Sequence, residues 1–173
     1  MPAMTLKEYQ AFQLKHDQQY HPEILYLGVA RHMNHVALHL VKYLSRFFSY
    51  EPHDPEYRQA LVDSYIMVVT AANLLSIDLS QTLGEAASAT SDQPSFKKAF
   101  ILLLGDLAKA CEATDHQEDF PIRKTWARVV TALFELLSME AKQLRLEIIH
   151  DATIRLQAVE GRHGLSNIFQ ANG

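Results

Sequence analysis

The chain has 173 residues, of which 48% are hydrophobic and 21% charged, and this composition fits one globular domain with a sizeable core. The formal net charge of −4 gives no sign of the clustered basic surface on which general DNA or RNA binding depends, so we expect no nucleic-acid partner. Cys111 is the only cysteine, which excludes an internal disulfide and a thiolate-rich zinc site and fits a reducing cytoplasm.

The composition also predicts the fold class. Glycine and proline are scarce, with six residues each, and Leu, Ala, Gln and Glu are abundant, which favours an all-α chain. The first predicted helix covers about residues 6–19. It is opened by Thr5 with Glu8 three residues later, the pattern of a capping box.

The next two predicted helices form a hairpin. The first of them, about residues 23–49, carries apolar residues in steps of three and four, which predicts a long amphipathic helix. The segment EPHDPEY at residues 51–57 supplies two prolines and a capping Asp54. It predicts a turn into an antiparallel helix that ends near Leu75.

The second half of the chain predicts another hairpin. A low-apolar stretch at residues 84–94 is the best candidate for a linker, followed by a helix over about residues 95–113. A last long helix covers about residues 122–159, with at most one break, and ends at a C-cap cluster that begins with Gly161.

We therefore expect a single all-α domain over residues 1–173, a bundle of about five helices built from two long antiparallel hairpins. The second hairpin, within residues 95–169, has a layout similar to the first, which is consistent with a divergent internal repeat.

Four residues of the first hairpin are candidates for a site. Asp63 is a lone acid on an otherwise apolar helix, and a buried carboxylate there needs a reason. Its alternative to a site role is packing, through a bond to a nearby His or to the hydroxyl of Ser64 or Tyr65. His32, His35 and His39 follow one another at i, i+3 and i+7, so they share one face of the preceding helix and could face that acid.

Three stretches of the first half carry a resemblance to a known family. They are TLKEYQAFQ at residues 5–13, LGVA at residues 27–30 and DSYIMVVTAANLLSIDL at residues 63–79. Over about residues 1–80 the chain resembles the MazG-like all-α nucleoside triphosphate pyrophosphohydrolases, which carry EExxE on one helix and ExxD on the next. The resemblance implies a nucleotide ligand, a homo-oligomer, and metal ions that hold a triphosphate while water attacks phosphorus and pyrophosphate leaves.

This chain departs from the family pattern at the acids. In the register of LGVA, the acids of EExxE are replaced by Arg31, His32 and His35, and the Glu of ExxD is replaced by Ala60. Magnesium prefers oxygen ligands, so Mn or Zn is a more plausible ion than Mg for a site of imidazoles and one carboxylate. We therefore expect a weak or inactive member with a degenerate metal site. If the chain is an enzyme, it is a nucleoside triphosphate pyrophosphohydrolase.

Three interpretations of the histidines stay open. They are partly solvated or hydrogen-bonded residues of a cavity that has lost its acids, or they form a transition-metal site in which His32, His35, His39 and Asp63 are the ligands. In the third interpretation, Arg31 and protonated histidines hold a nucleotide phosphate without metal. Asn73, in the Ala-Asn position of the family pattern, is a further nucleotide-binding candidate, with capping or packing as its alternative.

A function from another class also fits the sequence. A helical bundle with apolar helix faces can serve as a non-catalytic interaction or regulatory protein that binds a helical protein partner or itself. No apolar run approaches the roughly 20 residues of a membrane-spanning helix, and the first residues lack the apolar core of a signal peptide. We therefore expect a cytoplasmic protein without a membrane partner.

Overall fold

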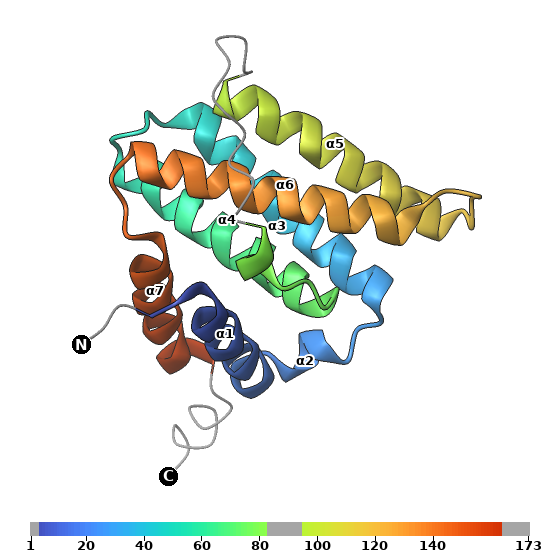
Figure 1. The fold of residues 1–173 in the computed structure, drawn as a ribbon, viewed down its shortest axis with the longest axis horizontal. Helices are drawn as coiled ribbons and strands as arrows, with labels where there is room; N and C mark the ends of the chain where they lie inside the picture. The colour runs from blue at the N-terminus through green and yellow to red at the C-terminus, as the bar shows by residue number, and fades with distance from the viewer. Residues whose placement is uncertain (1–3, 83–94, 164–173) are drawn as a thin grey trace.

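The computed structural model describes residues 4–82 and 95–163, and within these ranges every regular element is a helix. The elements are α1 (Leu6–Tyr20), α2 (Pro22–Leu25), α3 (Val29–Ser49), α4 (Pro55–Leu74), the 3-10 helix η1 (Leu79–Gln81), α5 (Phe96–Asp115), α6 (Ile122–Gln143) and α7 (Ile148–His163) (Figure 1). The predicted all-α fold is confirmed. No helix in the described ranges is both long and apolar enough to cross a membrane.

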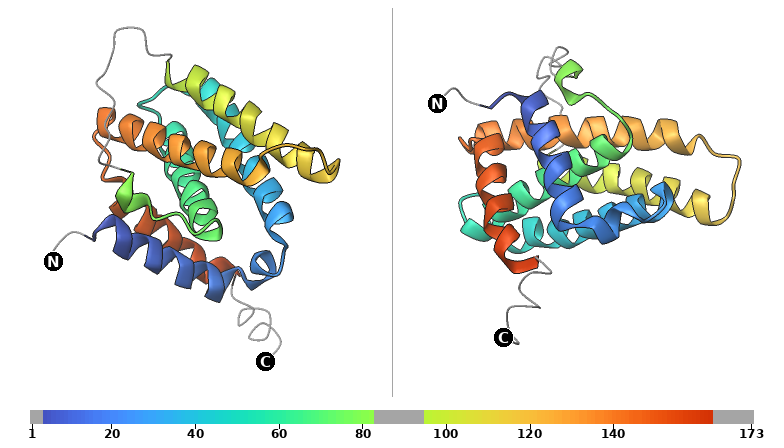
Figure 2. Two further views of the ribbon diagram at one scale, coloured as in Figure 1. Left: turned by 45° about the vertical axis from the view of Figure 1, so that its right-hand side comes forward. Right: turned by 90° about the horizontal axis from the view of Figure 1, so that it is seen from below.

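Helices α3 to α6 form a four-helix core, and α1 and α7 lie across one side of it (Figures 1 and 2). α3 packs against α4 and α5 against α6, as the two predicted hairpins require. The hairpins then join through contacts of α3 with α5 and of α4 with α6. α1 and α7 contact each other and α4, so three helices and the short α2 surround the N-terminal half of α3.

The described part contains seven α-helices where about five were predicted, mainly because two predicted helices are each interrupted by a turn. The helix predicted over residues 23–49 breaks between α2 and α3, where Gly28 has a φ of −59° and a ψ of 156° and acts as the N-cap. The helix predicted over residues 122–159 breaks after α6 and continues as α7 to His163. Gly161 therefore lies inside α7, while the predicted linker at residues 84–94 lies outside the described residues.

The turn after α6 shows why that break was hard to place from sequence. Ser76, Gln117 and Arg145 follow α4, α5 and α6, and their φ angles of 58°, 52° and 56° lie in the left-handed region. After α6, the Arg145 N–H donates to the Lys142 carbonyl at 3.1 Å, and the next N–H donates to the Ala141 carbonyl at 2.9 Å. This pair of bonds is the Schellman motif, which usually has glycine at the left-handed position. The usual glycine signal is missing here.

A cluster of aromatic rings fills the core where α3 ends and α4 and α5 begin. The ring centroid of Phe47 lies 4.9 Å from that of Tyr57 and 5.3 Å from that of Phe100. Glu140 of α6 is buried beside this cluster, and its Oε1 accepts a hydrogen bond of 2.7 Å from the Tyr57 hydroxyl. The buried acid at this end of the bundle therefore has a partner.

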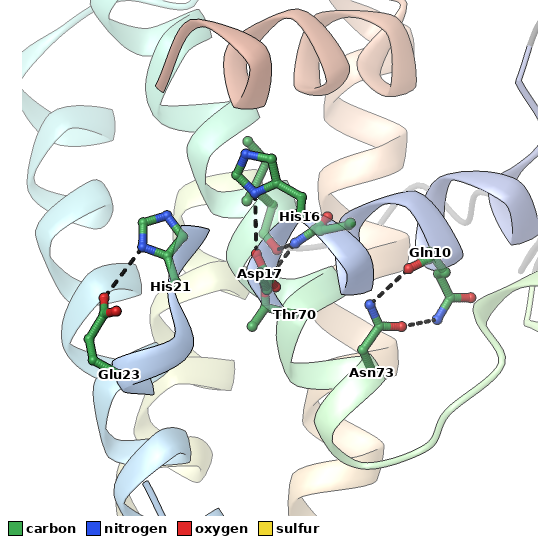
Figure 3. Close-up of polar contacts among 9 residues, drawn as sticks. Gln10, His16, Asp17, His21, Glu23, Thr70 and Asn73 are labelled. Carbon is green, nitrogen blue, oxygen red and sulfur yellow. Dashed lines mark hydrogen bonds and ion pairs between the residues drawn. The ribbon is translucent and has the colours of Figure 1, made fainter. Parts of the chain in front are cut away.

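Polar side chains dock α1 onto α4 (Figure 3). The side chains of Gln10 and Asn73 bond to each other's helices: the Gln10 amide donates to Asn73 Oδ1 at 3.1 Å, and the Asn73 amide donates to the Gln10 carbonyl at 3.1 Å. Gln10 also donates to the Ile77 carbonyl and accepts from the Leu79 N–H. This network fixes α1 beside the C-terminal half of α4 and so positions the last residues of α1 next to α3.

Candidate functional site

The carboxylate of Asp63 on α4 is held by an arginine of α7. Arg155 Nε donates to Asp63 Oδ1 at 2.8 Å, and Arg155 Nη2 donates to Oδ2 at 3.3 Å. The Asp63 side chain is only 12% exposed, and the bond to it raises the pKa of Arg155 above its ordinary value. The acid that the family pattern retains is thus neutralised by a two-point ion pair.

The three histidines of α3 line one pocket of about 290 Å³. Their shared helix face is the one predicted from their spacing. The other walls come from α1, α2, α4 and α7. They contribute the apolar Ile24, Ile66, Met67 and Leu156 and the polar Asp17, His21 and Thr70. The pocket therefore combines apolar walls with imidazole rings and one acid.

Burial keeps the α3 histidines uncharged. Desolvation is the main cause that lowers the pKa of His32, His35 and His39, and for His39 the pKa falls to about 4. Lys42, whose Nζ lies 3.4 Å from His39 Nδ1, lowers the pKa of His39 further, while the charge of Asp63 acts in the opposite direction. At neutral pH these rings therefore offer hydrogen-bond donors and acceptors rather than positive charge.

His32 is the most constrained of the three. It is 2% exposed, and neither of its ring nitrogens has a hydrogen-bond partner among the described residues. A buried polar group without a partner costs about 1–3 kcal/mol. Both nitrogens are closed to solvent, so a ligand in the pocket would supply the missing partners only by displacing side chains around the ring.

Asp17 supplies the negative charge of the pocket (Figure 3). Its Oδ2 accepts a hydrogen bond of 2.9 Å from the Thr70 hydroxyl, which itself accepts from the Gln13 amide at 2.6 Å. Its Oδ1 lies 3.7 Å from His16 Nδ1. Asp17 and Thr70 are thus fixed by contacts between α1 and α4. Among the described residues, no Lys or Arg lines the pocket.

The predicted metal site is not assembled. No group of three or more His, Cys, Asp or Glu in residues 4–82 and 95–163 is arranged to hold a metal ion. His32, His35 and His39 line the pocket, whereas Asp63 is not among its lining residues and is paired with Arg155. The expected set of three histidines and one aspartate, with Mn or Zn as its ion, therefore does not form in this arrangement.

The two predicted nucleotide-binding residues also lie elsewhere. Arg31 is exposed and does not line the pocket. The Asn73 side chain is committed to Gln10 through two hydrogen bonds, which is the packing role left open as its alternative. Neither side chain lines the histidine pocket.

Sequence reasoning found the histidines but missed the residues that complete the site. Asp17 and Thr70 come from different helices, and Arg155 lies 92 residues from its partner Asp63, so no local spacing links them. The polar residues of α1 were the one available signal, because a helix that packs on a core rarely carries Gln13 and Asp17 on its inner side without a reason. Comparisons with family models, with curated proteins and with solved structures gave no match for this chain.

Proposed function

We propose that the protein binds a small ligand with a flat nitrogen heterocycle, such as the base of a nucleotide, in the histidine pocket. In this proposal it is a divergent relative of the MazG-like pyrophosphohydrolases that does not hydrolyse nucleotides by their magnesium-dependent route. The observation that carries the proposal is His32, a buried imidazole in the pocket wall with two unpartnered nitrogens.

The pocket supports a heterocycle better than a phosphate. Neutral imidazoles attract an anion weakly, and the carboxylate of Asp17 repels one. A flat base can instead pack against the apolar lining residues, such as Ile24 and Met67, while its ring nitrogens and amino groups bond to Asp17 and, once the wall around the ring shifts, to His32. The volume of about 290 Å³ lies at the lower end of the range for ligand pockets, so the sugar and phosphates of a nucleotide would extend outside.

The loss of acids argues against magnesium-dependent hydrolysis. Two of the positions at which the resemblance puts the family's acids, His32 and His35, are imidazoles of the pocket wall. The retained Asp63 already has both oxygens bound by Arg155. Magnesium needs several oxygen ligands in octahedral geometry, and these residues do not offer them.

A thermal-shift titration tests the proposal directly. The protein is titrated with adenosine, guanosine, cytidine, uridine and the four triphosphates, each with Mg²⁺, Mn²⁺, Zn²⁺ or a chelator, and pyrophosphate release is measured in parallel. We expect at least one nucleoside to raise the melting temperature without metal, because a ligand that binds only the folded state stabilises it. We expect pyrophosphate release no faster than in the blank.

Three other results would contradict the proposal in different ways. Binding that requires Mn²⁺ or Zn²⁺ would restore the metal interpretation of the histidines. Magnesium-dependent pyrophosphate release that an Asp63→Asn variant loses would identify an active hydrolase. Absence of any shift with all eight ligands would leave the non-catalytic interaction protein as the better function, which the exposed apolar side chains of α3 and α5 favour.

A further inference from the structure

An exposed apolar surface extends over α3 and α5. It consists of Leu38, Val41 and Phe48 on α3 and of Ile101 and Leu102 on α5, and we call it the α3–α5 face. Leu38, Phe48 and Leu102 are each at least 60% exposed. On α3 these residues occupy a different side of the helix from the pocket histidines, so the face is separate from the pocket.

The two helices form one continuous surface. Phe47 near the end of α3 packs against Phe96 and Phe100 at the start of α5, with ring centroids 5.1 and 5.3 Å apart, so the helices are antiparallel neighbours. On the outer side, Lys97 Nζ lies 5.6 Å from the ring centroid of Phe48. Ile101, one turn further along α5, therefore continues the apolar surface that Phe48 begins.

The middle of α5 has room for a close neighbour. Gly105 and Ala108 are exposed there, and a Cβ placed on Gly105 would meet no atom within 4 Å. Small residues let two helix backbones approach closely. Leu102 lies three positions before Gly105 and Ala108 three positions after it, so a large residue is followed by two small ones along this side of the helix.

The charges of α5 are ordered in a way that suits a second copy of the same helix. Lys98 and Glu112 lie seven positions before and after Gly105, and both are exposed. Lys98 has no ion-pair partner among the described residues, while Glu112 contacts only Lys109 of its own helix. An antiparallel pair of α5 helices centred on Gly105 places Lys98 of each copy beside Glu112 of the other, and Leu102 over Ala108.

We infer that two copies of this chain associate through the α3–α5 face, about a two-fold axis that passes Gly105. The pairing buries Ile101 and Leu102 of both copies and brings Val41 and Phe48 against the partner helix. It forms two intermolecular ion pairs between Lys98 and Glu112. Because α5 lies outside residues 1–80, this inference does not rest on the family resemblance or on the ligand proposed for the pocket.

A cysteine at the axis tests the arrangement. In a Cys111→Ala background, Gly105→Cys brings two thiols together across the axis, where a disulfide can form only if the Cα atoms lie within about 7 Å. We expect light scattering to give twice the mass of one chain, and mild oxidation to convert most Gly105→Cys protein into a covalent dimer. Lys124→Cys, an exposed position on α6, is the matched control and is expected to stay uncrosslinked.

Charge reversal tests the register. Lys98→Glu alone and Glu112→Lys alone are each expected to weaken dimerisation by about tenfold, because each change affects two pairs in the dimer. The double variant, which exchanges the two charges, is expected to recover wild-type dimerisation. Leu102→Glu is expected to abolish the dimer, whereas Ile154→Glu, at an exposed apolar residue of α7, leaves it intact.

Each alternative outcome would overturn the inference. A monomeric wild-type mass at the highest soluble concentration would remove the dimer altogether. If Leu102→Glu and Ile154→Glu are both folded by circular dichroism and Leu102→Glu leaves the dimer unchanged, the interface lies elsewhere. A dimer that needs Leu102 but shows no recovery in the double variant and no crosslink at position 105 would contradict the antiparallel pairing.

Discussion

The two ends of α3 differ in what surrounds them, a packed aromatic cluster at one end and a pocket at the other. At its C-terminal end the aromatic rings of Phe47, Tyr57 and Phe100 pack together, and the buried acid beside them, Glu140, has a hydrogen-bond partner. At its N-terminal half, a pocket lies beside the core, and His32 is buried with no hydrogen-bond partner among the described residues. Folds tolerate unsatisfied groups mainly where function requires them, and this difference is the reason for proposing the ligand site at the N-terminal half of α3.

The largest expected effect is at the packed end. Phe100→Ala removes a fully buried ring from the aromatic cluster and should lower the free energy of unfolding by about 3–5 kcal/mol, measured by urea denaturation. The matched change at the open end, His32→Leu, deletes no hydrogen bond and should leave the free energy unchanged or raise it by about 1 kcal/mol. Equal losses in both variants would remove the contrast between the two ends.

The ion pair beside the pocket should have the next largest effect. Arg155→Met leaves the carboxylate of Asp63 mostly buried and unpaired and should cost about 2–3 kcal/mol of unfolding free energy. The double variant Asp63→Leu with Arg155→Met removes both charges and should recover most of that loss. A double variant as unstable as Arg155→Met alone would mean that the pair does more than neutralise a buried acid.

The low pKa of His39 makes stability depend on pH at the pocket end. The folded pKa is about 4 against 6.5 for a free histidine, so the unfolded chain binds more protons between these values. Stability is therefore complete above pH 6.5 and decreases as the pH falls toward 4. The expected loss is roughly 1–2 kcal/mol, after a discount for the solvent that reaches the pocket.

The comparison for this pH effect is His39→Gln, which keeps a polar group next to the Tyr43 hydroxyl but cannot titrate. As the pH falls through this window, the denaturation midpoint of wild type should fall relative to that of the variant. Parallel curves would show that His39 does not govern the acid response of this end of the bundle.

The smallest predicted effect is a gain in stability. Arg145 adopts a φ of 56° in the turn after α6, a conformation that glycine adopts without a Cβ clash. Arg145→Gly should therefore raise the free energy of unfolding by about 0.5–1 kcal/mol. Lys142→Gly, inside α6, is the control and should lower it by about 1 kcal/mol. A loss in both variants would mean that Arg145 makes a stabilising contact.

The helices were predictable from sequence because their signals are local. Thr5 and Glu8 form the predicted capping box, and the hairpin turn and the apolar periodicity placed α3, α4 and α5 well. The interruptions between α2 and α3 and after α6 were predicted poorly. Gly28, the N-cap of α3, lies within a sequence pattern that predicts a continuous helix. Arg145 adopts the left-handed conformation that usually marks a helix end by a glycine, so the sequence did not indicate the end of α6.

The site was predictable only in part, since its contacts join distant segments. The spacing of His32, His35 and His39 was enough to place them on one face of α3, and in the structure that face lines the pocket. The partner of Asp63 was not predictable, because Arg155 belongs to a helix whose start was itself missed. A lone acid on an apolar helix indicates that the acid has a partner but does not identify the partner residue.

The most direct test of the account is calorimetric titration of wild-type protein and His32→Leu with the four nucleosides, in metal-free buffer at pH 7. The account predicts that wild type binds at least one nucleoside and that His32→Leu binds it at least tenfold more weakly, while remaining at least as stable as wild type. His53→Leu, at an exposed histidine of the α3–α4 turn, should bind like wild type. Equal binding by wild type and His32→Leu, or no binding by either, would contradict the claim that the unpartnered imidazole marks a ligand site.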